Sequence, residues 1–487
     1  MSPLLIILII SGYFGLLFCI SWFTGKDNNN RAFFLGNKKS PWFIVAFGMI
    51  GASLSGVTFI SVPGWVGDSQ FGYMQVVLGY LVGYFVISFV LMPIYYKLNL
   101  TSIYSYLEQR FGKFSYKTGA FYFMLSRIIG ASFRLYLVAN VLQEFIFKEW
   151  GVPFEVTVII SILFIWLYTF RGGIKTIVWT DTLQTLFMLL AVGVSIFLIA
   201  GELDLGIGEL ASTIAGSDYS KMFFFDDLMA KDHFVKQFLG GAFIAITMTG
   251  LDQDMMQKNL TCKNIGDAQK NMISFSLVIV FANLFFLALG ALLFIYASKV
   301  GIDIPGNADL LYPTIALNGH LSIVAGVFFI LGLVAAAYSS ADSALTALTT
   351  SFCVDFLDIK KMDERRGERT RKITHVVISA VLLVVIIIFS KVTNKSVIDE
   401  ILTVAAYTYG PLLGLYAFGI LTKRKVLDKL VPVICIASPI LTHILKIYSI
   451  EWFYGYEFGY ELIVVNGILT FGGLLAITKF RGKDITL

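Results

Sequence analysis

Charged residues are scarce in this sequence: they make up 14% of its 487 positions, whereas soluble domains contain about a quarter. Apolar residues make up 57%, and the mean hydropathy is +0.79. A soluble core of this size cannot bury so much apolar surface, which excludes a water-soluble protein. The 37 basic residues exceed the 32 acidic ones only slightly and are spread over many loops. This distribution excludes a nucleic-acid-binding protein, which would gather its basic residues on one surface.

Cysteine and histidine are also rare, with four of each. The cysteines (Cys19, Cys262, Cys353 and Cys435) lie far apart in the chain, and therefore predict neither a disulfide framework nor a zinc site. The histidines are scattered, and the sequence has no HExxH or GxSxG motif. A membrane enzyme is therefore disfavoured, and we expect no catalytic residues.

Long polar segments are missing as well. The longest loop, about 203–236, is acidic and too short for a second domain. This disfavours a membrane sensor, which would need an attached signalling domain. We expect a single transmembrane domain over residues 1–487.

Apolar segments fill most of the chain instead. With a window of about 19 residues, thirteen stretches are long and apolar enough for membrane-spanning helices, so the expected fold class is all-α integral membrane. The first stretch follows no basic n-region, and we interpret it as a span and not as a secretory signal. The stretches lie near 4–23, 41–66, 73–98, 118–147, 153–170, 181–202, 237–257, 268–298, 321–355, 373–391, 397–421, 426–447 and 460–480.

The distribution of basic residues agrees with this number of spans. Alternate loops, including three basic residues after the seventh stretch, and the C-terminal tail carry 27 of the 37 basic residues. Cytoplasmic loops are rich in Lys and Arg, so the N-terminus is predicted outside and the C-terminus in the cytoplasm. The segment Lys360–Lys372 is the strongest cytoplasmic anchor. We expect the chain to be integral to a plasma membrane, the inner membrane of a bacterium.

The second stretch contains an unusually polar segment, Gly51–Thr58, with the sequence GASLSGVT. Its glycines, serines and threonine weaken a helix and offer hydroxyl and carbonyl oxygens. Transporters place ions and substrates at interrupted helices. A packing seam of small residues between two helices would have the same composition.

The ninth stretch contains alanines followed by hydroxyl residues, in the sequence AAAYSSADS from Ala335 to Ser343. Residues three or four apart share a helix face, so Ser339, Asp342 and Ser343 form a stripe of oxygen atoms, which hard cations prefer as ligands. Close helix packing explains the serines and alanines but not Asp342. The alternative role of Asp342 is a salt bridge.

Asp181 lies near the start of the sixth stretch, in the sequence GGIKTIVWTDTLQ. It is either an N-cap or, if the helix begins nearer Ile177, a carboxylate inside the membrane and a candidate ion ligand.

Two arginines, Arg127 and Arg134, lie seven residues apart in the fourth stretch and hence roughly on one helix face. Arg127 is close enough to the end of the stretch to snorkel toward an interface. Arg134 lies nearer the middle, where we expect it to face a cavity, a counter-charge or an anionic substrate.

The seventh stretch is a second candidate for a broken helix. It contains Gly240-Gly241 and Thr247-Met248-Thr249-Gly250, followed by Asp252 and Asp254, which we place near a cytoplasmic helix end. It follows the first candidate by five stretches, the spacing that an inverted repeat of five helices predicts.

Together these segments resemble the sodium:solute symporter family. The resemblance covers essentially the whole chain and rests on GASLSGVTF, GGIKTIVWTDTLQ and AAAYSSADSALTALTTSFCVDF. It implies the LeuT-type fold, with two inverted five-helix repeats. Here the repeats would occupy 41–202 and 237–421, with one extra N-terminal helix (4–23) and two C-terminal helices (426–480).

The resemblance also implies sodium ligands, transferred by position. The sodium site common to the family would use the carbonyls of Gly51, Leu54 and Ala336 and the hydroxyls of Ser339 and Ser340. A second sodium site, present in some branches, would use Asp181, Ser339, Asp342 and Ser343. Position 342 is usually a hydroxyl residue in the family, so Asp342 would strengthen this site, bind a proton or be neutralised by a basic residue.

The sialic-acid-transporting branch is the most similar in the residues of the substrate site. The hexose branch has a glutamine where Thr58 stands, and the proline branch has an acid where Ser53 stands. An arginine of the fourth stretch would meet a carboxylate, and either Arg127 or Arg134 fits this role. The implied substrate-binding residues are Ser53, Ser55, Thr58, Phe71, Gln75, Arg127 and Arg134.

We therefore expect a monomeric secondary active symporter that works by alternating access. It would use one or two sodium ions to import a small organic solute, such as the carboxylate-bearing sugar sialic acid. A neutral sugar, an amino acid or another small anion are alternative solutes. A passive channel is the alternative of another class, but it would need a continuous polar stripe, whereas the polar residues here gather near mid-membrane in three or four stretches.

Overall fold

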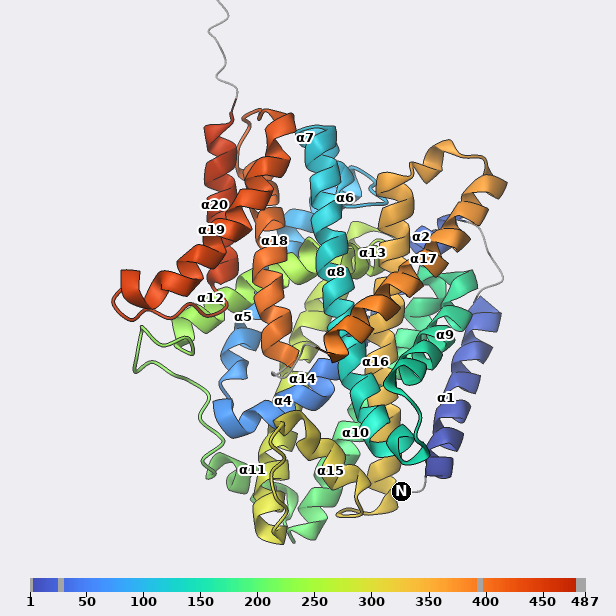
Figure 1. Cartoon of the computed structure of the whole chain (residues 1–487), viewed down its shortest axis with the longest axis vertical. Helices are drawn as coiled ribbons and strands as arrows, with labels where there is room; N and C mark the ends of the chain where they lie inside the picture. Colours follow the sequence, from blue (N-terminus) through green and yellow to red (C-terminus); the bar gives the residue numbers. More distant parts are fainter. Residues whose placement is uncertain (1–2, 25–29, 392–396, 479–487) are drawn as a thin grey trace, which may run out of the picture.

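The computed structural model describes residues 3–24, 30–391 and 397–478, and in these ranges the chain is a bundle of long helices (Figure 1). Its only β-pairings there are two isolated bridges. The predicted all-α membrane architecture is confirmed. The end of the last predicted stretch, residues 479 and 480, and the tail after it lie outside the described residues.

Each of the thirteen predicted stretches corresponds to a helix, to helices that follow one another directly, or to a bent pair. In chain order these are α1 (Pro3–Thr24), α3 (Trp42–Ser53) with α4 (Gly56–Ser69), α5 (Tyr73–Val86) with η2 (Ile87–Leu91) and α6 (Met92–Lys97), α8 (Lys113–Leu142), α9 (Phe154–Gly172), α10 (Ile174–Glu202), α12 (Phe234–Ala245) with η5 (Ile246–Gly250) and α13 (Gln253–Asn259), α14 (Ile265–Val300), α16 (Ile323–Ser351), α17 (Glu364–Ser390), α18 (Val397–Leu421), α19 (Val431–Trp452) and α20 (Leu462–Ala476). Shorter helices outside these stretches are α2 (Asn30–Leu35), α7 (Ser105–Arg110), α11 (Ile207–Ala215) and α15 (Leu311–Leu317).

In the described part of the chain, nine helices are long and apolar enough to cross a membrane, and each of the two bent pairs counts as one further span. The remaining two predicted stretches correspond to shorter apolar segments, Phe154–Thr169 in α9 and Leu462–Ala476 in α20. The number of thirteen spans stays a prediction.

Both candidate broken helices are broken. The axis bends by 54° between α3 and α4 and by 68° between the helix Phe234–Gly250 and α13. The first break lies within the Gly-Ala-Ser-Leu-Ser-Gly segment, and the second within Thr-Gly-Leu-Asp. Glycine and hydroxyl residues are poor helix formers, so sequence composition explains where each bend occurs.

Helix α10 begins seven residues before the predicted stretch does. Gly173, with φ of 50°, precedes Ile174, and a β-carbon at Gly173 would overlap the ring of Phe33. A residue with a side chain fits this left-handed, crowded position poorly. Because the turn lies at Gly173, Asp181 is two helical turns inside α10 and fully buried, and is not an N-cap.

Helix α16 lies in the middle of the bundle, beside α8 and α10 (Figure 1). Every residue from Gly332 to Ser351 is buried. The stripe of hydroxyl and carboxylate groups on this helix therefore faces protein on all sides and does not face lipid.

The ends of the bundle separate as the charge pattern predicts. The first described residues, α11 and α15 lie at one end, and the connection between α16 and α17 lies at the other (Figure 1). That connection and the first turns of α17 contain the basic segment Lys360–Lys372. One of the basic residues assigned to a loop, Lys258, is instead buried in α13.

The close contact of α5 with α12 gives a test of this packing. A β-carbon at Gly241 would overlap the Val76 carbonyl oxygen. We expect Gly241→Val to lower the free energy of unfolding by about 3 kcal/mol, the upper end of the usual cost of overpacking. The cost is high because the backbone atoms of Val76 cannot move aside as a side chain can. Thermal unfolding in detergent measures the loss. Gly193→Val, in open space on α10, is the matched control, and an equal loss in both variants would contradict the packing.

Candidate functional site

The break between α3 and α4 exposes backbone carbonyl groups inside the protein. Helix α3 ends at Ser53, Leu54 leaves the helical region at φ −78° and ψ 44°, and α4 begins after Ser55. The last carbonyls of a helix lack an intrahelical donor. The carbonyls of the last turn, which includes Gly51 and Leu54, are therefore available as ligands.

Helices α10 and α16 meet at this break. A β-carbon at Gly51 would overlap Thr185 Oγ1 on α10, one turn after Asp181. A β-carbon at Gly56 would lie 3.8 Å from the Ala337 Cα of α16. The broken helix is thus packed against α16 at Ala337, one helical turn before Ser340.

Ser340 is the clearest candidate for a cation ligand on α16. Its side chain is fully buried, and its Oγ has no hydrogen-bond partner among the described residues. A buried hydroxyl without a partner is unfavourable unless a ligand or ion satisfies it. The oxygen atoms of Ser340 and of the break, all from neutral groups, fit a monovalent hard cation such as sodium.

Three side chains contact the Asp181 carboxylate. Ser339 Oγ donates to its Oδ1 at 2.6 Å, and Ser343 Oγ donates to its Oδ2 at 3.4 Å. The ammonium of Lys258 lies 2.8 Å from the same Oδ2. The structure therefore brings together Asp181, Ser339 and Ser343, as the second sodium site requires, but with a lysine that sequence reasoning had assigned to a loop.

Asp342 lies beside this cluster, and its side chain accepts a hydrogen bond from another helix, α9. Tyr168 Oη donates to Asp342 Oδ2 at 2.7 Å, while Oδ1 has no hydrogen-bond partner within the described ranges. Of the three roles open to Asp342, direct ion pairing is not the one seen, because the nearby lysine pairs with Asp181.

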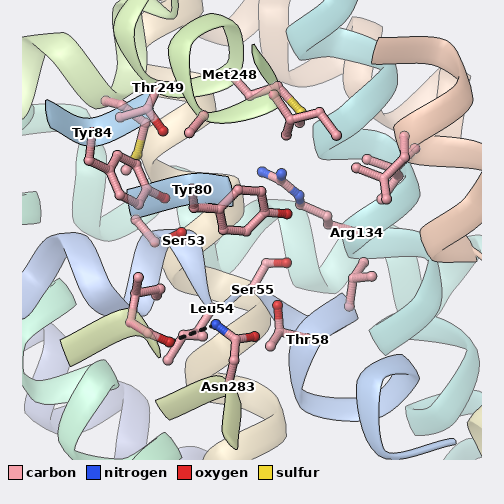
Figure 2. Close-up of a pocket in the computed structure, with 18 of the residues that line it drawn as sticks. Ser53, Leu54, Ser55, Thr58, Tyr80, Tyr84, Arg134, Met248, Thr249 and Asn283 are labelled. Carbon is pink, nitrogen blue, oxygen red and sulfur yellow. Dashed lines mark hydrogen bonds between the residues drawn. The ribbon is translucent and has the colours of Figure 1, made fainter. Parts of the chain in front are cut away.

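A cavity of about 100 Å³ opens on the same break. Ser55, Thr58 and Arg134 border it, and the Arg134 side chain extends toward Tyr80 across the space from them (Figure 2). Its lining residues are Ala52, Ser53, Leu54, Ser55, Val57, Thr58, Tyr73, Tyr80, Tyr84, Arg127, Arg134, Ile244, Ala245, Met248, Thr249, Met255, Ile279, Asn283, Ile401 and Leu402.

The two arginines of α8 have different surroundings. Arg127 forms an ion pair with Asp254 and lies 3.9 Å from Asp252. Arg134 has no ion-pair partner among the side chains that the structure describes, and its buried Nε has no hydrogen-bond partner there. Arg134 is therefore the arginine with charge available to the cavity.

Phe71 and Gln75 lie outside the lining of this cavity. The Gln75 side chain accepts from Phe224 N at 3.0 Å and donates to the Asp232 carbonyl at 3.1 Å. Phe71 is buried, and its backbone N–H donates to the Lys221 carbonyl. In this conformation both residues hold the loop between α11 and α12.

Several lining residues were missed at the sequence level. Tyr80 and Tyr84 line the cavity from α5, and Asn283 lines it from α14 (Figure 2). Asn283 Nδ2 donates to the Ile279 carbonyl, and its Oδ1 has no partner within the described ranges. The sequence feature that could have indicated Asn283 is a single amide side chain within an apolar stretch. Met248 and Thr249 belong to the second break, which the sequence did indicate.

Asp252 and Asp254 do not lie at an exposed helix end. Both are buried at the second break. Asp252 caps α13 by accepting from Asp254 N at 2.9 Å, and its Oδ2 accepts from Tyr409 at 2.5 Å. The break thus places this helix end, the start of α13, inside the bundle, and its position on the cytoplasmic side stays a prediction.

Comparison with known proteins identifies relatives over most of the chain. The model described as "Sodium:solute symporter family" matches residues 33–426. The "Sodium/sialic acid symporter NanT" of Aliivibrio fischeri is 26% identical over 94% of this chain and 91% of its own length. The "Sodium-coupled monocarboxylate transporter 1" of Xenopus laevis is 26% identical over 85% of this chain and 67% of its own length. All three descriptions are of transporters.

A solved structure of a Na⁺-coupled sialic acid symporter in a substrate-bound outward-open state is similar along the whole chain. Its TM-score is 0.83 at 21% identity, and the similarity covers 97% of this chain and 98% of that one. This confirms the LeuT-type fold.

The common sodium site can be tested at Ser340. We expect Ser340→Ala to weaken sodium affinity about ten- to hundredfold, because a buried hydroxyl ligand to a charge is lost. Ser339→Ala should also weaken it. Sodium-dependent changes in thermal stability of the purified protein measure this affinity. Ser276→Ala, which removes a buried hydroxyl bonded to Ile273 within α14, is the control, and unchanged affinity in Ser340→Ala would remove Ser340 from the site.

Proposed function

This chain belongs to the sodium:solute symporter family, and we propose that the solute it imports with sodium is a sialic acid. The single observation that carries the choice of solute is Arg134. Its guanidinium borders the cavity and has no ion-pair partner among the described side chains. A buried cation without a partner is unfavourable, and a carboxylate that binds there would supply the missing charge.

The groups around Arg134 suit a solute with both hydroxyl groups and a carboxylate. Ser55 and Thr58 offer hydroxyls, Asn283 offers an amide, and Tyr80 and Tyr84 combine aromatic surface with a hydroxyl. An arginine can bind a carboxylate through two parallel hydrogen bonds. The names of the relatives give sialic acid or monocarboxylates as their solutes. These solutes all carry a carboxylate, which agrees with this assignment.

Coupling would follow from the position of the two sites on one break. Sodium bound by Leu54 and Ser340, together with Gly51, Ala336 and Ser339, would fix α3 and α4 against α16. That arrangement also sets the positions of Ser53 and Ser55 at the cavity. Each ligand then favours a conformation that the other also favours, which is the condition for thermodynamic coupling.

We propose a monomer in a bacterial inner membrane, with the N-terminus outside and the C-terminus in the cytoplasm. The inverted repeats would be 41–202 and 237–421, each starting with a broken helix. Neutral sugars fit less well, because they would leave the charge of Arg134 unpaired.

Uptake into proteoliposomes tests the function. We expect N-acetylneuraminate to accumulate about tenfold above equilibrium under a tenfold inward sodium gradient with one sodium per solute, since each factor of ten in a gradient is worth about 1.4 kcal/mol. Potassium in place of sodium should abolish accumulation. A passive channel would equilibrate the solute and never concentrate it, so flux only down its own gradient would overturn the symport.

The solute assignment can be tested at Arg134. We expect Arg134→Gln to weaken N-acetylneuraminate binding about ten- to hundredfold, because a hydrogen bond between charged groups is lost. The methyl ester of the solute, which has no carboxylate charge, should bind both proteins about equally weakly. Solute-induced thermal shifts measure both. Equal affinity of the wild type for the acid and the ester would contradict the role of Arg134.

A further inference from the structure

The candidate second sodium site already contains a positive charge from the chain itself. Lys258 Nζ lies 2.8 Å from Asp181 Oδ2, which makes a close, buried ion pair between an ammonium and a carboxylate. The lysine side chain is 1% exposed and the aspartate 0%. Ser339 and Ser343 donate to the same carboxylate. Three of the four groups of this site, Asp181, Ser339 and Ser343, are therefore already bonded to one another, and the Asp181 carboxylate is ion-paired with this lysine.

The bend of the second broken helix holds Lys258 in this place. Lys258 belongs to α13, which follows the 68° bend. Its Nζ is also 4.0 Å from Asp254 Oδ1, and Asp254 pairs with Arg127. The ammonium thus lies between two carboxylates that come from different helices, and the ion pairs connect α8, α13 and α10.

A sodium ion and this ammonium would compete for one carboxylate. A sodium bound to Asp181 would lie a few ångströms from Nζ, and two like charges repel strongly in a buried site. The Lys258 side chain is fully enclosed, so its ammonium cannot move into water without a conformational change. The charge of the Asp181 carboxylate, a ligand of the second sodium site, is therefore compensated without a second ion.

We propose that the Lys258 ammonium takes the place of a second sodium ion, so that the protein binds one sodium, at the common site. The inference rests on the proposed sodium symport and specifies its stoichiometry. A tethered ammonium is not released into the cytoplasm, so it moves no net charge over a complete cycle. Symport of one sodium with one monocarboxylate is then electroneutral.

Binding of radioactive sodium to the purified full-length protein, without solute, tests the stoichiometry directly. We expect one sodium per wild-type chain at saturation. Lys258→Met removes the ammonium but keeps an apolar side chain of similar length, and we expect two sodium ions per chain. Lys258→Met combined with Asp181→Asn should return the number to one. Lys263→Met, which removes an exposed lysine five residues later, should leave it at one.

Membrane voltage provides a second measurement, which needs no variant. In proteoliposomes with a fixed sodium gradient, an inside-negative potential of about 100 mV should leave steady-state N-acetylneuraminate accumulation in the wild type unchanged within about twofold. In Lys258→Met the second sodium carries one net charge inward, and the same potential should raise accumulation about fiftyfold.

Two sodium ions on the wild type, or one on both the wild type and folded Lys258→Met, would overturn the inference. So would a voltage-dependent wild type. If Lys258→Met does not fold, the wild-type sodium number and voltage response still decide. These results are separate from failure of the proposed solute, because sodium is counted without it, and a chain that binds one sodium but does not accumulate N-acetylneuraminate contradicts only the solute.

Discussion

The structure depends on one constraint: a carboxylate buried at membrane depth needs a compensating positive charge. Asp181 is the residue to which this applies most directly, because it lies two turns inside α10 and is fully buried. Its partner, Lys258, comes from the second broken helix, and that lysine also approaches Asp254, which pairs with Arg127. Truncation of one member of such a pair leaves the other charge uncompensated, at a cost of about 3–5 kcal/mol. The helices α8, α10 and α13 are therefore connected by charge as well as by packing, and α16 joins them through Ser339 and Ser343.

The two broken helices have complementary roles in this arrangement. The break at Leu54 leaves carbonyl oxygens without intrahelical donors beside the cavity, whereas the break before α13 brings the Lys258 ammonium into the bundle. Both breaks border the cavity, the first through Ser55 and Thr58 and the second through Met248 and Thr249. A change in the angle of either helix would alter the solute site and an ion site together, which is the property that coupled transport needs.

Much of this could be predicted from the sequence, for identifiable reasons. Long apolar stretches locate membrane helices because lipid leaves few other structures possible, and clusters of glycine, serine and threonine identified both breaks. Residues whose role depends on long-range contacts could not be predicted in this way. Lys258 looked like a loop cation because it follows an apolar stretch, and only the bend shows that it is buried. Arg127 and Arg134 were equivalent in spacing, and the partner that separates them, Asp254, is 120 or more residues away in the chain. Gln75 was expected at the solute site, but it bonds a loop whose path has no sequence pattern.

The Gln75 side chain connects the loop between α11 and α12 to helix α5 at two points. Its amide holds the backbone at Phe224 and at Asp232, while its own backbone belongs to α5. A displacement of α5 would therefore be passed to this segment, which runs along one side of the bundle between α11 and α12 (Figure 1). A fluorophore attached to this loop would report that displacement without any chemical change to the residues that line the cavity.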